Sequence, residues 1–416
     1  MGQKVGIIGG GIIGLSCAYY LQQSGHGVTI IDKGDLTDGC SMGNAGMVVP
    51  SHIIPLASPG MIRKGIRWMF NPRSPFYVRP RFSGDLIRWG YLFYRHATTE
   101  HVERAIPALK ELSLFSKSLY QQWSKELPFD FGYHERGLLM LYRTKEAGHE
   151  EEATARIASQ HGLVAKVLSA GEVQELEPHV KVSVKGGVFF PGDAHLTPQK
   201  LTTGLIQYLE NQGVKFMLGE TVVNVVLKEK EIRLVKTTHH EFDFDLVVVA
   251  TGSWSGEFCK LFGLSLPMQA GKGYSFTVDR PNDNVNIPSI LLEDRVAVTP
   301  MGKTLRFGGT MEITGVNHSI NMKRVEGIVN AIPRYYPKLE LAMPDKQSVW
   351  HGLRPCSPDG LPYIGRVGRF KNLILATGHS MMGLSLAPGT GKLVAQLVNT
   401  ERPAVPLVPF AADRFD

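Results

Sequence analysis

Apolar runs and helix-like segments alternate at the start of the chain, and their order predicts a strand, a helix and a second strand. Residues 5–8 are continuously apolar apart from one glycine, residues 12–21 are mostly apolar or small, and residues 28–31 form a second apolar run. Short apolar runs of this kind are typical of strands buried on both faces, as in parallel sheets. The first segment therefore predicts a βαβ unit.

The same alternation returns later in the chain. We expect it to resume near 186–190, with a helix over 199–211 and a strand at 214–217. Residues 245–252 predict a buried strand that ends in small residues, and 372–377 predict another strand before a C-terminal helix. Strands that alternate with helices are typical of a parallel sheet.

The remaining segments have other patterns. Apolar positions recur at helical spacing from 106 to 127, residues 137–142 predict a strand, and 151–161 predict a helix. Between about 267 and 347, strand-like runs alternate with Gly, Pro and Asn turns. That stretch predicts an antiparallel sheet, which would form most of a second domain.

Three glycines follow the first strand at a spacing that suggests a nucleotide. Gly9, Gly11 and Gly14 have G-x-G-x-x-G spacing, and Asp32 ends the second strand. In this pattern the glycines allow a tight turn and close approach to a pyrophosphate, while the acid binds a ribose hydroxyl. A glycine turn of some other α/β fold is the alternative. The strand, helix and acid at the required positions favour a dinucleotide site.

Composition limits the class of protein. The chain has 416 residues, 43% of them hydrophobic and 20% charged, which favours a globular protein of two domains. No apolar run approaches the ~18 residues that span a bilayer, and the first strand begins too early for a signal peptide, so we expect a cytoplasmic protein. The four cysteines are scattered and the net charge is +7, so we expect neither a metal site nor a nucleic-acid partner.

Residues 61–95 are rich in arginine and aromatic side chains and almost free of acids. Two interpretations remain open. The stretch suits peripheral contact with an anionic membrane, at the inner face of the cell membrane, because aromatic rings favour the headgroup level. The arginines could equally extend their stems over an ordinary aromatic core.

Taken together and in order, several segments resemble the D-amino acid oxidase superfamily of FAD-dependent flavoproteins, and most closely the small-subunit type of D-amino acid dehydrogenase. The resemblance rests on the N-terminal fingerprint, the 41–46 loop, the 245–252 strand, Gly352-Leu353-Arg354-Pro355 and the 378–391 segment. It implies an α/β plus α+β fold: a Rossmann-like FAD-binding domain with a discontinuous antiparallel-sheet substrate domain. The implied division is 1–60, 186–262 and 348–400 for the FAD-binding domain, 61–185 and 263–347 for the substrate domain, and 401–416 for a C-terminal tail.

The resemblance also implies how FAD is held. The glycines would contact the pyrophosphate, Asp32 the adenosine ribose and Val223 the adenine, while the 41–47 loop and the 378–384 loop would lie near the flavin. The expected cofactor-binding residues are Gly9, Gly11, Ile12, Ile13, Gly14, Asp32, Lys33, Ser41, Asn44, Ala45, Gly46, Met47, Val223, Thr251, Gly252, Trp254, Gly378, His379, Met382, Gly383 and Leu384.

Arg354 matches the arginine that pairs with the substrate carboxylate in related oxidases. Its fork suits a carboxylate, and the alternative is an internal ion pair. Tyr274 would either donate to the same carboxylate or pack in the sheet. His52 and His379 would face the pocket or be structural. The expected catalytic residues are Arg354, Tyr274 and His52.

The implied reaction is hydride transfer from Cα of a D-amino or D-imino acid to flavin N5, which leaves an imino acid that water converts to a 2-oxo acid. Electrons would pass to a quinone or another acceptor. The 46–52 segment departs from the commonest dehydrogenase pattern, which brings in cyclic substrates such as cis-4-hydroxy-D-proline. The alternatives are a glycine or sarcosine oxidase that uses oxygen, a nicotinamide-dependent dehydrogenase, and a non-catalytic flavin-binding subunit.

Overall fold

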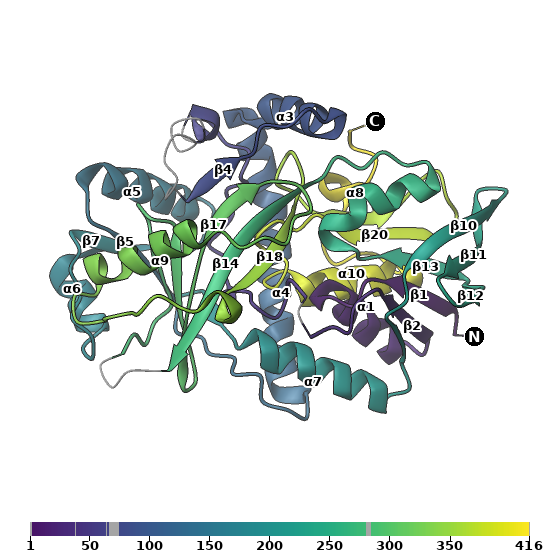
Figure 1. The fold of residues 1–416 in the computed structure, drawn as a ribbon, viewed down its shortest axis with the longest axis horizontal. Coiled ribbons are helices and arrows are strands. Elements are labelled where there is room, and N and C mark those ends of the chain that lie inside the picture. The colour runs from purple at the N-terminus through teal and green to yellow at the C-terminus, as the bar shows by residue number, and fades with distance from the viewer. Residues whose placement is uncertain (1, 38, 64, 66–74, 280–283, 416) are drawn as a thin grey trace.

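Two large sheets lie side by side and account for most of the strands (Figure 1). The computed structural model describes residues 2–37, 39–63, 65, 75–279 and 284–415. Part of the basic and aromatic stretch, Lys64 and residues 66–74, therefore lies outside the described residues.

The first sheet has six strands, and all neighbours are parallel except the last pair. In spatial order they are β9 (Lys215–Leu218), β2 (Gly27–Asp32), β1 (Lys4–Ile8), β13 (Leu246–Val249), β20 (Leu373–Thr377) and β19 (Tyr363–Arg366). Helix α1 (Ile12–Gln23) joins β1 to β2. The predicted βαβ unit is confirmed.

Both faces of this sheet are covered, which explains its continuously apolar strands. Helices α1, α4 (Thr99–Glu126), α7 (Pro198–Asn211) and α10 (Ala387–Val398) contribute to the core on one face. On the other face lie the segment 259–266 and a small sheet of β10 (Val222–Lys228), β11 (Glu231–Thr237) and β12 (Glu241–Phe242).

The second sheet has nine strands and is mainly antiparallel. Along its path it contains β18 (Trp350–Cys356), β14 (Gln269–Asp279), β17 (Thr304–Ile313), β16 (Val296–Met301), β15 (Ser289–Leu291), β5 (Leu138–Tyr142), β7 (Gly186–Phe190) and β6 (Lys166–Ser169), while β4 (Phe76–Val78) pairs with β17. Between 267 and 347 the expected antiparallel strands are confirmed.

Helices cover the second sheet on each side. The amphipathic α9 (Met322–Tyr335), which the sequence analysis did not predict, packs with α6 (Ala170–Leu176) on one face. Helix α5 (Lys145–Gln160) packs on the other, beside the short strand β3 (Met47–Val48), which pairs with β8 (Ala194–His195). Helix α3 (Gly84–His96) lies at the edge near the C-terminus (Figure 1).

Strand pairing corrects the expected division of the chain at two places. Strand β7 was expected in the nucleotide sheet, but it pairs antiparallel with β5 and β6. Strand β18 pairs with β14, so residues 350–356 also belong to the second sheet. A short apolar run is compatible with either sheet, because its partner is set by contacts far away in sequence. Helix α4, which was expected in the substrate domain, packs in the core of the first sheet, and this is a further correction. The rest of the division stays a prediction.

The C-terminal tail packs back onto the first sheet. Phe410 is fully buried, and Arg414 forms an ion pair of 2.7 Å with Asp359 and lies over the ring of Tyr363. The mixed arrangement of a parallel sheet and a largely antiparallel one confirms the expected fold class. In the described part of the chain, no helix combines the length and apolarity needed to cross a membrane.

Candidate active site

A cavity of about 1670 Å³ reaches the carboxyl ends of β1, β2, β13 and β20 and extends along the second sheet. Ligands of open α/β sheets bind at the carboxyl ends of the strands. The volume exceeds the ~300–1,000 Å³ of ordinary small-molecule pockets. It therefore has room for an extended cofactor together with a substrate.

The glycine turn after β1 has the geometry that its sequence predicts. Gly9 has a φ of +107°, and a Cβ on Gly14 would overlap the carbonyl oxygen of Gly9. Gly11 precedes α1 without a capping side chain, no acid lies in the first turn, and one N–H, that of Ile12, donates to Ser41 Oγ at 3.0 Å. The start of the helix is therefore suited to an anion.

Asp32 organises the same turn from the end of β2. Its carboxylate accepts the N–H of Gly10 at 2.7 Å and that of Gly34 at 2.8 Å. Asp32 also borders the cavity. The side chain thus joins the glycine turn to the position expected for a ribose.

The 41–47 loop is fixed against the second sheet. Arg306 donates to the carbonyl oxygens of Met42 at 3.0 Å and Asn44 at 2.8 Å, and Ser275 Oγ donates to that of Gly43 at 2.8 Å. Burial lowers the pKa of Arg306 to about 10, so the side chain stays charged at neutral pH. The sequence analysis did not predict this role of Arg306, because the residues around an arginine on a strand do not indicate a partner far away in sequence.

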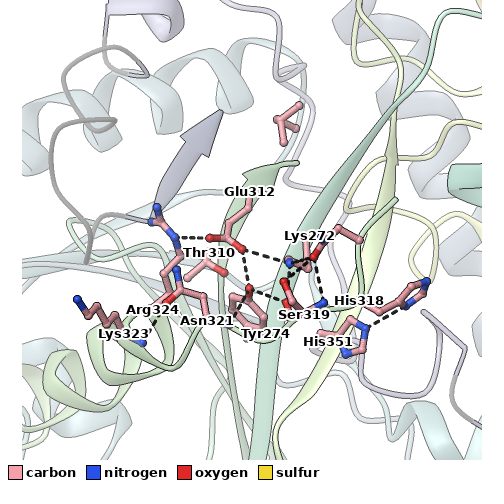
Figure 2. Close-up of polar contacts among 12 residues, drawn as sticks. Lys272, Tyr274, Thr310, Glu312, His318, Ser319, Asn321, Lys323, Arg324 and His351 are labelled. Atoms are coloured by element: carbon pink, nitrogen blue, oxygen red, sulfur yellow. Dashed lines mark hydrogen bonds and ion pairs between the residues drawn. The ribbon is translucent and has the colours of Figure 1, made fainter. Parts of the chain in front are cut away.

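A row of rings borders the cavity after β13. Lys33 Nζ lies 3.8 Å from the ring centroid of Trp254, and Trp254 stacks on His318 at 6.2 Å. His318 Nδ1 lies 3.1 Å from His351 Nε2, as Figure 2 shows. The sequence analysis did not predict these two histidines, since no spacing pattern connects His318, in the loop after β17, with His351 on β18.

The 378–384 loop is joined to strand β18. The N–H of Ser380 donates to the carbonyl oxygen of Pro355 at 2.9 Å. His379 Nε2 lies 2.9 Å from Thr390 Oγ1, and burial lowers the His379 pKa to about 3. His379 is therefore a neutral ring with a structural partner on α10.

Arg354 borders the cavity and has no acidic partner in the described part of the chain. Its Nη1 donates to the carbonyl oxygen of Thr310 at 2.6 Å, and burial lowers its pKa. Among the described residues, Arg354 does not form the internal ion pair that was the alternative expectation. The guanidinium keeps its charge and most of its N–H groups for another ligand.

Tyr274 was expected either to donate to the same carboxylate as Arg354 or to pack in the sheet, and its hydroxyl lies away from Arg354. Arg354 pairs in register with Gly271, and side chains alternate along β14, so Tyr274 points to the opposite face. There its hydroxyl donates to Glu312 Oε2 at 2.5 Å. Tyr274 borders the cavity, but its hydroxyl is used within the sheet.

His52 borders the cavity next to a buried polar pair. Ser51 Oγ donates to Asp193 at 2.5 Å and lies 3.1 Å from His52 Nδ1. Burial raises the pKa of the Asp193 carboxyl to about 7. Burial and the nearby Arg295 lower the His52 pKa to about 4, so the ring is neutral at pH 7.

Most of the expected cofactor residues meet at this cavity. Its wall includes Gly9, Gly11, Ile12, Ile13, Asp32, Lys33, Ser41, Asn44, Ala45, Met47, Thr251, Gly252, Trp254, His379, Met382, Gly383 and Leu384. Gly14, Gly46, Val223 and Gly378 are not part of the wall. Val223 is 53% exposed, although its neighbour Val222 borders the cavity. The individual roles stay predictions.

Comparison with known proteins identifies the family. The family model DAO, described as FAD dependent oxidoreductase, matches residues 4–397. The chain belongs to this family. The expected family membership and the expected FAD are thereby confirmed, and the chain is an FAD-dependent oxidoreductase.

Individual relatives cover the whole length. The chain is 31% identical over 399 residues to a D-amino acid dehydrogenase of Helicobacter pylori, with 95% of each chain covered. It is 30% identical over 421 residues to the enzyme of that name from Rhizorhabdus wittichii, with 99% of this chain and all of that one covered. The fold resembles the solved glycine oxidase of Geobacillus kaustophilus, with a TM-score of 0.80, 24% identity and 100% of both chains covered.

The residues present fit FAD. The adenosine and pyrophosphate half of FAD fits the glycine turn, the start of α1 without a capping side chain, and Asp32. The cavity continues from these residues to Arg354. Residues of the 41–47 and 378–384 loops border the remaining length of the cavity.

Replacing Asp32 by alanine should weaken FAD binding by about 10-fold or more, because a charge-assisted contact is lost and two backbone N–H groups lose their acceptor. Titration of the apoprotein with FAD, followed by flavin fluorescence, measures the dissociation constant. Asp243→Ala is the control, since that side chain is 79% exposed and lies beside Lys4 at the start of β1, at the opposite end of the strands from Asp32. An unchanged FAD affinity in Asp32→Ala would contradict the ribose contact.

Proposed function

We propose that this protein oxidises a D-amino acid or a cyclic D-imino acid, and that Arg354 binds the substrate carboxylate. The observation that carries the proposal is a partly buried arginine that borders the flavin cavity and has no acidic partner among the described residues. The full-length relatives named D-amino acid dehydrogenase support the substrate class.

The chain supplies position and charge. When bound, FAD supplies the acceptor for the hydride that leaves the substrate Cα. Arg354 would bind the carboxylate by two parallel hydrogen bonds, which fixes the direction of Cα. His52 and His379 are neutral, so neither places a second positive charge beside the substrate amine. The resulting imine hydrolyses to a 2-oxo acid, or stays cyclic when the substrate is an imino acid.

Two finer assignments belong to the same proposal. The 46–52 segment supports a cyclic substrate such as cis-4-hydroxy-D-proline. A quinone or another acceptor would receive the electrons. A glycine or sarcosine oxidase that uses oxygen is the alternative. The structural similarity to glycine oxidase concerns the fold alone, so it does not decide between the two. Rapid oxygen consumption with glycine or sarcosine would favour the alternative.

Replacing Arg354 by alanine should raise the KM for the substrate by about 30-fold or more with FAD still bound, since truncating one member of a buried charged pair costs about 2 kcal/mol or more. Arg354→Lys should also raise KM, because lysine cannot form the two parallel bonds. Steady-state kinetics with an artificial electron acceptor measures both. Equal KM values for the three proteins would rule out this role.

Helix α3 supports contact with a membrane, where a quinone would be found. Its side chains Leu86, Trp89 and Phe93 pack against the second sheet. The opposite side exposes Ile87 (66%), Tyr91 (59%) and Tyr94 (68%), at i, i+4 and i+7, next to the fully exposed Phe82. Arg88 and Arg95 are exposed on the same helix. We propose that this surface, called here the α3 surface, docks on an anionic bilayer.

The triple variant Ile87→Ser/Tyr91→Ser/Tyr94→Ser should bind vesicles of phosphatidylcholine and phosphatidylglycerol at least 10-fold more weakly than the unmodified protein, since it loses apolar area at the interface. Co-sedimentation measures the partition coefficient. Val164→Ser/Val167→Ser/Val408→Ser is the control, because these side chains are equally exposed elsewhere. The α3 surface has no such role if the triple variant and the unmodified protein sediment alike.

A further inference from the structure

The pairing register of strands β14 and β17 shifts at one point, next to Arg354. Lys272 pairs with Glu312 and Tyr274 pairs with Gly309, so Thr310 and Met311 together lie opposite the single residue Gly273. Two residues opposite one define a β-bulge, a feature found beside active sites, where it redirects a side chain. Thr310 has a φ of +67°, which is rare for a β-branched residue. Such strain persists only where surrounding contacts hold it.

The bulge and the glycine opposite it both contact Arg354. The carbonyl oxygen of Thr310 accepts from Arg354 Nη1 at 2.6 Å. The guanidinium lies over Gly273, because a Cβ at that position would overlap Nη1, Nη2 and Cζ. Thr310 thus supplies the hydrogen-bond acceptor, and Gly273 leaves the space that the guanidinium occupies.

On the opposite face of the sheet, the carboxylate of Glu312 joins the residues on either side of Gly273 (Figure 2). Glu312 Oε2 accepts from Tyr274 at 2.5 Å and lies 3.7 Å from Lys272 Nζ, so it contacts the residues on both sides of Gly273. Glu312 Oε1 forms an ion pair of 2.5 Å with Arg324 of α9. All four side chains are buried. We call Glu312 with Tyr274, Lys272 and Arg324 the Glu312 clamp.

We propose that the Thr310–Met311 bulge, opposite Gly273 and held by the Glu312 clamp, is a positioning device that presets the Arg354 guanidinium for a carboxylate. This rests on the proposed function of Arg354. A carbonyl partner orients the guanidinium without neutralising it, which a carboxylate partner would do. Because Arg354 Nη1 already bonds to the Thr310 carbonyl oxygen, the side chain has fewer rotamers in the free enzyme. Binding of a carboxylate then costs less conformational entropy.

The test uses the FAD-bound enzyme and propionate, which carries a carboxylate but no amine to oxidise. Calorimetry should show at least 10-fold weaker propionate binding in Gly273→Ala, because the added methyl displaces the guanidinium. The KM for the amino acid should rise more than kcat falls, and FAD content should be unchanged. Gly27→Ala on β2 is the control, since its Cβ would meet only the Gln3 carbonyl oxygen at 3.8 Å.

A double-mutant cycle separates positioning from a general loss of structure. In an Arg354→Ala background, Gly273→Ala should weaken propionate binding no further, because the glycine acts only through the arginine. An equal loss in both backgrounds overturns the proposal. If Arg354→Ala alone leaves propionate affinity unchanged, the proposed function fails instead.

Tyr274→Phe tests the clamp with a change that does not face Arg354. Loss of the hydroxyl should weaken propionate binding about 3-fold with FAD content unchanged, since Glu312 then no longer bonds to one side of Gly273. Unchanged propionate affinity would remove the clamp from the positioning device.

Discussion

A partly buried positive charge without an acidic partner in the described chain, that of Arg354, is the constraint around which this site is built. Taking a guanidinium out of water is costly unless other groups bond to it. Among the residues that the structure describes, the Arg354 side chain bonds to one carbonyl oxygen, that of Thr310. The guanidinium charge is therefore available to a ligand. Its position depends on the strained backbone of Thr310 and on the absence of a side chain at Gly273.

The same elements connect the cofactor half of the cavity with the substrate half. Arg306 and Ser275 of the second sheet bind the 41–47 loop, and the backbone next to Arg354 binds the 378–384 loop. Both loops border the cavity that begins at the glycine turn. Because cofactor and substrate contacts share these segments, the position of Arg354 is tied to the walls that would enclose the flavin.

Local patterns predicted the nucleotide half well. The βαβ unit, Gly9, Gly14 and Asp32 follow from hydrophobic runs and spacing within the first 32 residues, and the structure has them as expected. The sequence could not decide the sheet to which β7 and β18 belong, because partners of short apolar strands are distant in sequence. It also could not decide the face to which Tyr274 points, since that depends on the register with β18. The bulge at Thr310 has no local signal, because threonine is an unusual residue for a positive φ.

We propose that this flavoprotein oxidises the D-enantiomer of an amino or imino acid held at Arg354. The most direct measurement is the anaerobic absorbance spectrum of the FAD-bound protein during titration with the D- and L-forms of alanine, proline and cis-4-hydroxyproline. At least one D-compound should bleach the oxidised flavin band, and its L-enantiomer should not. A flavin band that no D-compound bleaches, or that an L-enantiomer bleaches equally well, would contradict this proposal.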